Sequence, residues 1–361
     1  MEVTMRVHLY TGALSLVRKS GVGQAIFHQE AMLESAGVTV TGGWEEKADA
    51  VHINTVLPDS VLAALRARLR GETVIYYGHS TMQDFRNSFV GSNLLAPLFQ
   101  KWICFCYNLG DVILTPTPYS QQLLESYHLK KPVLALSNGV DTAFFKPSKT
   151  QRCAFRRRFG LQESDKVVIS VGHMIERKGI LDFIEMARAL PEAHFFWFGY
   201  TDPALVPEPI KAAMAAAPEN VCFPGFLDQS SLRDAYCGAD VFAFCSKEET
   251  EGIVVLEALA CGTPTVVRDI PVYADWLRGG IDVYKAADAP EFTQIVSGML
   301  AGTLPELTLA GRRVAQARSL QNMGRQLCRI YRSRHILPGP ITTPAWQPEQ
   351  TVPSRQPAVL P

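Results

Sequence analysis

The sequence predicts an α/β fold made of two doubly wound, Rossmann-like domains that face each other across a central cleft. Strand-like apolar runs alternate with helical patterns along most of the chain, which is typical of parallel sheets covered by helices. The alternation occurs on both sides of one linker, and 361 residues are enough for two hydrophobic cores. A ligand site is therefore expected in the cleft, at the carboxyl ends of the strands.

The first domain is expected to comprise residues 1–147. Its apolar runs are short and are separated by turn-forming residues, as parallel strands with covering helices require. Asn138-Gly139 marks a turn, and Pro147 closes the domain. Strands are expected at residues 5–9, 38–41, 50–54, 73–77, 111–116 and 132–136, and helices at residues 28–36, 60–70 and 117–127.

The second domain is expected to comprise residues 148–318. A C-terminal helical segment, 319–336, is expected to pack back on the first domain, and the Pro-, Thr- and Gln-rich residues 337–361 predict a disordered tail. In the second domain and the segment after it, strands are expected at residues 166–172, 194–198, 221–223, 241–245, 265–267 and 281–284, and helices at 151–159, from 179 onward, 253–261, 290–301 and 309–334.

The most unusual segment is 82–110, which is long, aromatic and apolar and carries few charges. Pro97 is expected to break it in the middle. The segment is either a pair of buried helices or an apolar lip that receives a lipid acceptor or enters a bilayer surface. The candidate residues for such a surface are Phe85, Phe89, Leu94, Leu95, Leu98, Phe99 and Trp102.

The stretch around Gly252 organises the chain and predicts strand, loop, helix and strand in succession. Gly252 lies at the start of the helix, so the amides of Gly252, Ile253 and Val254 have no partners within that helix. Such a helix N-terminus binds phosphate well. Glu249 precedes the helix and Glu257 lies inside it, so a ligand held there would meet one carboxylate on each side. The alternative is that both are solvated charges, on a loop and on a polar helix face.

Polar residues and glycines also follow three other predicted strands. His79 lies at the carboxyl end of a strand, where open α/β sheets bind ligands, although a lone histidine is more often structural. Arg177 and Lys178 suit a diphosphate leaving group, unless they are two solvated surface cations. Gly21 and Gly23 allow a ligand to approach the backbone closely, although a lone G-x-G is more often a turn.

Composition limits the classes of function. A formal net charge of zero and 19% charged residues give no global field that would favour nucleic acid. The eight cysteines are scattered without a C-x-x-C pair, which predicts reduced core thiols in a cytoplasmic protein and no zinc site. The N-terminus lacks the features of a signal peptide, and no run of about 18 apolar residues occurs. We therefore expect a protein that is soluble or lies on a membrane without crossing it.

Up to about residue 334, the chain resembles the retaining glycosyltransferases of family 4. The motifs that carry the resemblance are Y-G-H-S-T-M-Q-D-F-R-N-S-F, D-V-I-L-T-P-T-P-Y-S, S-N-G-V-D, E-E-T-E-G-I-V-V-L-E-A-L-A and V-R-D-I-P-V-Y-A-D-W-L. Together they look most like the bacterial 1,2-diacylglycerol 3-glucosyltransferases. The resemblance implies the glycosyltransferase B fold and transfer of glucose from UDP-glucose to the 3-hydroxyl of a membrane diacylglycerol, with retention. It also implies that no cofactor or bound metal is required and that the protein lies on the inner face of the cell membrane.

The resemblance implies a role for each candidate residue. Glu249 and His79 would hold the transferred sugar, and Glu257 would bind the ribose of the nucleotide. Arg177 and Lys178 occupy the G-x-x-x-x-R-K-G pattern of the diphosphate site. The glycine loop after the first strand would face the donor phosphates and the acceptor.

The chain departs from the common family text at three places. Glu249-Thr250-Glu251-Gly252 replaces the commoner E-G-F-G, Cys245-Ser246 replaces Pro-Ser, and the helix after Pro97 carries little charge apart from Lys101. The last departure argues against electrostatic docking to a membrane. Two alternatives stay open: a family 4 enzyme that acts on a soluble, cell-wall or exopolysaccharide acceptor with glucose, galactose or mannose, and a non-catalytic nucleotide-sugar-binding membrane scaffold.

Overall fold

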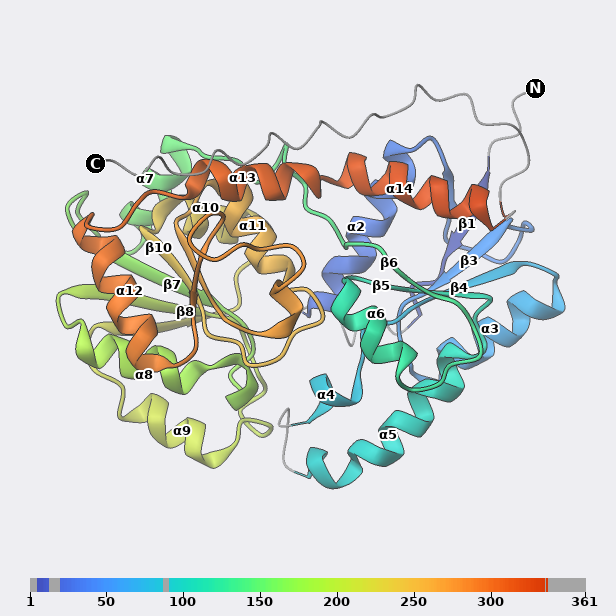
Figure 1. Ribbon diagram of the computed structural model, residues 1–361, viewed down its shortest axis with the longest axis horizontal. Coiled ribbons are helices and arrows are strands. Elements are labelled where there is room, and N and C mark those ends of the chain that lie inside the picture. Colours follow the sequence, from blue (N-terminus) through green and yellow to red (C-terminus); the bar gives the residue numbers. More distant parts are fainter. Residues whose placement is uncertain (1–4, 13–19, 87–90, 335, 337–361) are drawn as a thin grey trace, which may run out of the picture.

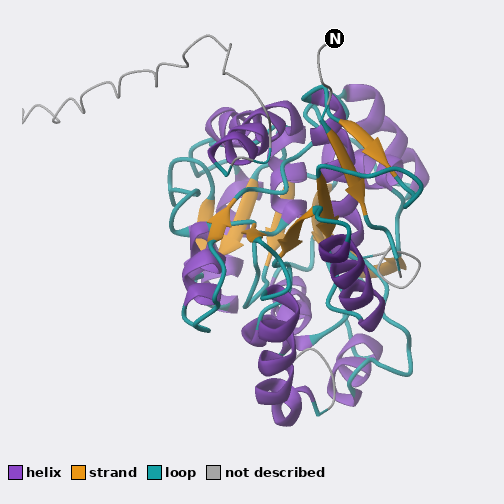
Figure 2. Cartoon of the chain, turned by 90° about the vertical axis from the view of Figure 1, so that its right-hand side faces the viewer, coloured by secondary structure: helices purple, strands orange, loops and turns teal. Residues whose placement is uncertain are grey.

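The computed structural model describes residues 5–12, 20–86, 91–334 and 336 of the chain, and it contains two parallel six-stranded sheets (Figure 1). One sheet belongs to the N-terminal half of the chain and the other to the C-terminal half. Figure 2 shows helices on both sides of the strands. The predicted α/β fold with two doubly wound sheets is confirmed.

The N-terminal half buries its central strands on both faces, because helices cover both sides of a parallel sheet. Its strands are β1 (Arg6–Leu9), β2 (Thr39–Thr41), β3 (Ala50–Ile53), β4 (Thr73–Tyr77), β5 (Val112–Thr115) and β6 (Val133–Ala135). Its helices are α2 (Gly21–Ser35), α3 (Pro58–Leu69), α4 (Met82–Phe85), α5 (Ser92–Tyr107) and α6 (Pro118–Glu125). Helix α6 begins with the capping box of Thr117 and Ser120, as its sequence predicts.

The C-terminal half repeats this architecture with longer inner strands. Its strands are β7 (Lys166–Val171), β8 (Ala193–Phe198), β9 (Val221–Gly225), β10 (Val241–Phe244), β11 (Thr265–Arg268) and β12 (Tyr284–Ala286). Its helices are α7 (Lys149–Arg158), α8 (Ile180–Ala189), α9 (Glu208–Ala215), α10 (Gln229–Gly238), α11 (Ile253–Cys261), α12 (Ala289–Ala301) and α13 (Thr308–Ala317), with 3-10 turns η1 (Glu176–Lys178) and η2 (Pro271–Tyr273). Helices α9 and α10 were not predicted.

The strand order creates one switch point in each sheet. The orders are β2-β1-β3-β4-β5-β6 and β12-β11-β10-β7-β8-β9, so the chain winds outward in both directions from β1 and from β7. Ligands of doubly wound folds bind outside the carboxyl ends of the strands at such points. The loops that follow β1, β4, β7 and β10 are thus the ones to inspect for a site.

The last helix returns to the N-terminal half. Helices α13 and α14 (Leu320–Ser333) run from the C-terminal sheet to the N-terminal one, as Figure 1 shows in red. Leu327 and Tyr331 are buried in one core cluster with Met5 and Val7. The predicted single helix at 309–334 is wrong, because the chain turns at Ser319, whose hydroxyl caps α14.

Several other local predictions need correction. Pro97 lies inside α5 without breaking it, since a proline near the helix start removes only one intrahelical hydrogen bond. The strand predicted at 281–284 is displaced to β12, and β9 includes Pro224 and Gly225, which were predicted to turn. Cys153 and Cys222 are exposed, so not all the free thiols belong to the core. The domain boundaries at 147, 318 and 336 remain a proposal, and the predicted disordered tail lies outside the described residues.

The close packing of α14 on α2 gives a test of this architecture. A Cβ atom at Gly324 would lie 2.5 Å from the carbonyl oxygen of Met32 and 2.9 Å from Ser35 Oγ. We expect Gly324→Ala to lower the free energy of unfolding by about 1 to 3 kcal/mol, because the overpacked helix must shift. Urea unfolding measures this change. Gln326→Ala, on the exposed side of the same helix, is the control. Equal stability of the two variants would contradict the tight α2–α14 packing.

Candidate active site

Most of the candidate residues gather where loops of the two halves meet. His79 follows β4, Arg177 and Lys178 lie on η1 after β7, and Glu249 lies in the loop between β10 and α11. An ion pair of 2.6 Å between Arg177 Nη1 and Asp84 Oδ1 joins η1 to α4 across the two halves. These loops therefore build one site from both halves of the chain.

The N-terminus of α11 has the geometry predicted for it. Gly252 is the N-cap residue with a φ of +85°, in the left-handed region that glycine adopts without strain. A Cβ atom there would lie 2.9 Å from the hydroxyl of Tyr273. That hydroxyl is buried and has no hydrogen-bond partner among the described residues. Tyr273 was not predicted as a site residue, although it lies in the motif V-R-D-I-P-V-Y-A-D-W-L.

Glu249 is a buried carboxylate held by cations. Its side chain forms an ion pair with Lys178. Burial alone would raise the pKa of Glu249, but Lys178, Arg177 and hydrogen bonds from Lys178 and Ser246 hold it below its ordinary value. The turn that carries Lys178 lies against the end of β10, since a Cβ atom at Gly179 would meet the Cys245 carbonyl oxygen at 2.2 Å. Glu249 is thus ionised and fixed.

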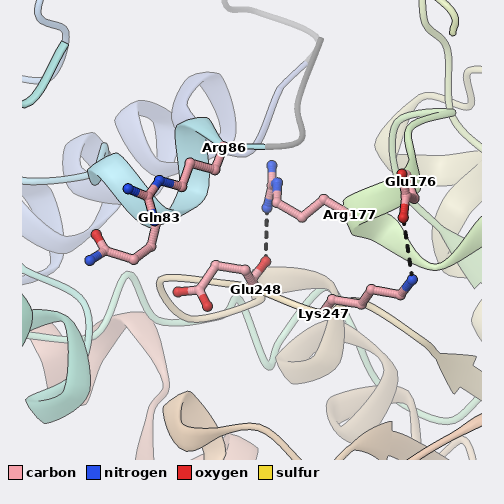
Figure 3. Close-up of a pocket in the computed structure, with 6 residues that line it drawn as sticks. All are labelled: Gln83, Arg86, Glu176, Arg177, Lys247 and Glu248. Atoms are coloured by element: carbon pink, nitrogen blue, oxygen red, sulfur yellow. Dashed lines mark hydrogen bonds and ion pairs between the residues drawn. The ribbon is translucent and has the colours of Figure 1, made fainter. Parts of the chain in front are cut away.

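Arg177 is also engaged. Besides Asp84, its Nη1 donates a hydrogen bond of 2.8 Å to the carbonyl oxygen of Glu248 (Figure 3). The side chains of Arg177 and Lys178 are only 11% and 14% exposed. They are therefore not solvated surface cations, and each pairs with a carboxylate near the cleft.

Glu257 lies inside the protein. Its residue is 2% exposed, and its Oε2 accepts a hydrogen bond of 2.9 Å from the Tyr236 hydroxyl. Burial raises the pKa of Glu257 to about 8, and the Tyr236 hydrogen bond only partly opposes that rise. The alternative that Glu257 lies on a polar, solvated helix face is wrong. The carboxyl group is mostly protonated at neutral pH.

A buried hydrogen-bond chain orients His79. Asn54 Oδ1 lies 2.9 Å from His79 Nε2, and Asn54 exchanges two hydrogen bonds with Gln29, of 2.5 and 3.0 Å. Because Oδ1 accepts, His79 Nε2 carries the proton and Nδ1 does not. Burial lowers the pKa of His79 to about 4, so the ring is neutral. Asn54 and Gln29 were not predicted, since nothing in their local sequence marks them.

The predicted glycine loop is partly corrected. Gly21 and Gly23 form the first turn of α2 rather than the loop before it, and Ser20 caps that helix through its hydroxyl. A Cβ atom at Gly21 would meet no atom within 4 Å, so no neighbour requires glycine there. The residues between 12 and 20 lie outside the described part of the chain. Both glycines are still at the carboxyl end of β1, at the switch point of the first sheet.

Glu251 joins the two halves and was not predicted as a site residue. Its Oε2 accepts hydrogen bonds of 3.0 Å from the backbone amide of Asn138 and 2.8 Å from its side chain. Its Oε1 accepts a hydrogen bond from the Ser137 hydroxyl. Glu251 stands at the departure from the common family text, and its partners belong to the S-N-G-V-D motif. These two features together were the available signal.

Helix α5 presents an apolar surface to solvent. Leu94 and Leu98 are 86% and 67% exposed, and Leu95 and Trp102 are also exposed. Phe105, which was not predicted, extends the same face. Phe85 and Phe99 do not belong to it, because their rings stack on each other at 4.0 Å between α4 and α5. Phe89 lies outside the described residues. We call the set Leu94, Leu95, Leu98, Trp102 and Phe105 the α5 apolar face.

Two searches of the described residues were negative. No helix there is long and apolar enough to cross a membrane. In the same part of the chain, no three His, Cys, Asp or Glu side chains are arranged to hold a metal ion.

Two family models match the chain, one in each half. The model described as Glycosyltransferase Family 4 matches residues 44–144, and the model described as Glycosyl transferases group 1 matches residues 151–292. Among curated proteins, the Processive diacylglycerol alpha-glucosyltransferase of Acholeplasma laidlawii is 41% identical over 91% of this chain and 98% of its own length. The Alpha-galactosylglucosyldiacylglycerol synthase of Streptococcus pneumoniae is 26% identical over 70% of this chain and 68% of its own length. The predicted resemblance is confirmed.

Solved structures support the predicted fold. HepE of Anabaena, in complex with UDP and glucose, superposes with a TM-score of 0.69 at 15% identity and covers 91% of this chain and 100% of its own. Sucrose-phosphate synthase of Thermosynechococcus elongatus superposes with a TM-score of 0.73 at 16% identity, over 92% and 99% of the two chains. At these identities the likeness concerns the fold alone. The predicted glycosyltransferase B fold is confirmed.

The chain from Gln29 through Asn54 to His79 makes a prediction about protonation. Asn54→Asp would place a carboxylate against the Nε2 proton of His79, which favours the imidazolium form. We expect the pKa of His79 to rise from about 4 by one unit or more, as followed by NMR of the histidine ring during a pH titration. Asn322→Asp adds the same charge on α14 and is the control. An unchanged pKa in the Asn54 variant would show that the two side chains are not in contact.

Proposed function

The chain belongs to the family 4 glycosyltransferases, and we propose that it moves glucose from UDP-glucose to the 3-hydroxyl of a membrane diacylglycerol, with retention at the anomeric carbon. The observation that carries this proposal is the combination of a buried, charged site between the halves with an exposed apolar face on α5. A lipid acceptor requires such an apolar face beside the site, whereas a soluble acceptor does not. The relative from A. laidlawii bears the name of a diacylglycerol glucosyltransferase, which agrees with this acceptor.

We assign the donor to the C-terminal half. The helix N-terminus at Gly252, Ile253 and Val254 offers backbone amides and a partial positive charge to the diphosphate. Arg177 and Lys178 would exchange their present carboxylate partners, in whole or in part, for phosphate oxygens. UDP-glucose carries a dianionic diphosphate, so it competes well against single carboxylates for these cations.

Glu257 suits the ribose of the nucleotide. The carboxyl group is buried, and a single tyrosine hydroxyl donates to it among the described residues, so it has further acceptor capacity. A pair of ribose hydroxyls would supply the hydrogen bonds that an ionised, buried carboxylate needs. Loss of this contact should weaken donor binding more than it slows chemistry.

The chemistry requires a leaving group, a nucleophile and a base. The bond between the anomeric carbon and the phosphate oxygen breaks, and charge develops on UDP, where Arg177, Lys178 and the α11 amides stabilise it. The acceptor hydroxyl attacks from the same face and passes its proton to the departing phosphate. Glu249 and His79 would hold hydroxyls of the sugar. Because His79 is neutral, it exchanges hydrogen bonds with the sugar and adds no positive charge.

The acceptor would enter from the α5 apolar face. Exposed leucine and tryptophan side chains in a stripe along one helix are suited to the boundary between headgroups and acyl chains. Lys101 is the one cation on the described turns of α5, so apolar insertion rather than charge would hold the protein on the inner face of the cell membrane.

The reaction itself tests the proposal. The purified protein is incubated with UDP-glucose and diacylglycerol in mixed micelles, and lipid-linked glucose and UDP release are followed together. Matched appearance of both is expected. UDP release without a lipid product would assign a soluble or other acceptor, and no reaction with any nucleotide sugar would favour the scaffold.

Two substitutions separate donor binding from chemistry. We expect Glu257→Ala to raise KM for UDP-glucose about tenfold, because two hydrogen bonds to the ribose are lost, and to change kcat less. We expect His79→Ala to lower kcat by about tenfold or more with a smaller effect on KM. Initial rates over a range of UDP-glucose concentrations measure both constants. Normal turnover by both variants would refute these site assignments.

The α5 apolar face makes a separate prediction. Leu94→Ser with Leu98→Ser should weaken binding to phosphatidylcholine vesicles about 100-fold, since each buried leucine contributes roughly 1.5 kcal/mol. The affinity for UDP, measured by calorimetry, should stay unchanged. Leu309→Ser replaces a similarly exposed leucine on α13, at the far side of the molecule from α5 (Figure 1), and is the control. Equal vesicle binding by both variants would remove the membrane role of α5.

A further inference from the structure

A small cavity lies between the two halves, beside the residues assigned to the donor. It measures about 230 Å³ and is lined by Gln83, Arg86, Glu176, Arg177, Lys247 and Glu248. Figure 3 shows Gln83 and Arg86 projecting from α4 on one side, and the other four residues on η1 and on the loop after β10 on the other. Every lining residue is polar or charged. The neighbouring residue of Glu248 is Glu249, so the cavity opens next to the proposed sugar contact.

The size of the cavity limits its ligand. Pockets for drug-sized molecules usually measure about 300 to 1,000 Å³. The volume here, about 230 Å³, is below that range and does not suit a whole nucleotide sugar. A single sugar ring or a lipid headgroup is the appropriate size. The donor site at α11 therefore needs a different space, and this cavity is available to a second molecule.

The charges on the wall favour a neutral polyol over a phosphate. Lys247 Nζ lies 3.8 Å from Glu176 Oε1, and Arg177 already pairs with Asp84. Glu248 Oε1 accepts a hydrogen bond of 3.0 Å from the Tyr119 hydroxyl. A phosphate held here would face two carboxylates, which costs electrostatic energy. A sugar carries donors and acceptors on adjacent carbons, so it can satisfy cations and carboxylates together.

The cavity is also connected to the lipid face. Gln83 and Arg86 flank Phe85, whose ring stacks on Phe99 of α5 at 4.0 Å between centroids. The α5 apolar face lies on the same helix. A molecule with acyl chains on that face and a sugar as its headgroup could thus place the sugar in the cavity, close to Glu249.

We propose that this cavity, the hexose pocket, binds the sugar of an already glycosylated diacylglycerol, so that the protein adds a second hexose to its own first product. This inference rests on the function proposed above. In the second transfer, a hydroxyl of the bound sugar forms a bond to the anomeric carbon of the donor. The bond from that carbon to the phosphate breaks, and the proton of the hydroxyl leaves with UDP.

The test compares two acceptors in the same vesicles. Phosphatidylcholine vesicles carry either diacylglycerol or monoglucosyl-diacylglycerol, and lipid-linked radioactive glucose is measured for each. The variant Arg86→Ala with Lys247→Ala removes two exposed cations of the hexose pocket. Lys101→Ala removes an exposed cation of α5 that does not line the pocket, and it controls for general attraction to the membrane. Thermal unfolding of each variant verifies the fold.

We expect the native protein to use both acceptors. The double variant should lose about tenfold or more in kcat/KM for monoglucosyl-diacylglycerol, since hydrogen bonds from charged groups are lost, and should use diacylglycerol within about twofold of the native rate. The Lys101 variant should keep the native ratio of the two rates.

Three results would overturn the inference, and they are distinguishable. If the native protein glycosylates diacylglycerol but not the glycosylated lipid, the function proposed above stands and the hexose pocket does not. The same holds if the double variant uses the two acceptors in the native ratio. If that variant instead loses only an activation by added phosphatidylglycerol, the cavity binds a phosphate headgroup. If neither acceptor is used, the proposed function itself fails.

Discussion

The carboxylate of Glu251 is the contact on which the arrangement of the site depends. It is buried between the halves and accepts hydrogen bonds from Ser137 and Asn138, in the segment that leads out of the first sheet. A buried carboxylate without such partners would be costly, so the halves must meet in this register. Neighbouring residues of the same loop reinforce it, because Thr117 donates to the Thr250 carbonyl and Tyr119 to Glu248. Only Glu249 turns the other way, towards Lys178.

The cations of the site are neutralised before a donor arrives. Arg177 pairs with Asp84 and Lys178 with Glu249, and both pairs are mostly buried. An unpaired buried cation would destabilise the fold, so the carboxylates keep the site folded and charged at the same time. The affinity for a diphosphate is then a difference between two sets of partners. Because Asp84 belongs to the N-terminal half, any exchange of partners at Arg177 also alters the contact between the halves.

Local patterns in the sequence predicted the sheets and the charged motifs, and distant contacts account for what was missed. The strands were predictable because buried parallel strands are short apolar runs, and the start of α11 because glycine precedes an apolar helix. Asn54 and Tyr273 carry no local signal, since their importance comes from His79 and Gly252, which approach them only in the folded chain. Pro97 misled because its position within the helix, not its presence, decides its effect. The turn at Ser319 was missed because helical patterns continue on both sides of it.

The return of α14 to the first sheet bears on how the protein is made. Leu327 and Tyr331 complete a core that Met5 and Val7 begin, so the first half cannot finish folding until the last helix exists. Between the end of β6 and the start of α14 the ribosome adds roughly 180 residues, which takes about 10 to 40 seconds at bacterial rates. During that time α2 exposes the apolar side that α14 later covers. A nascent chain of this protein is thus a natural client for chaperones that bind exposed apolar helices during synthesis.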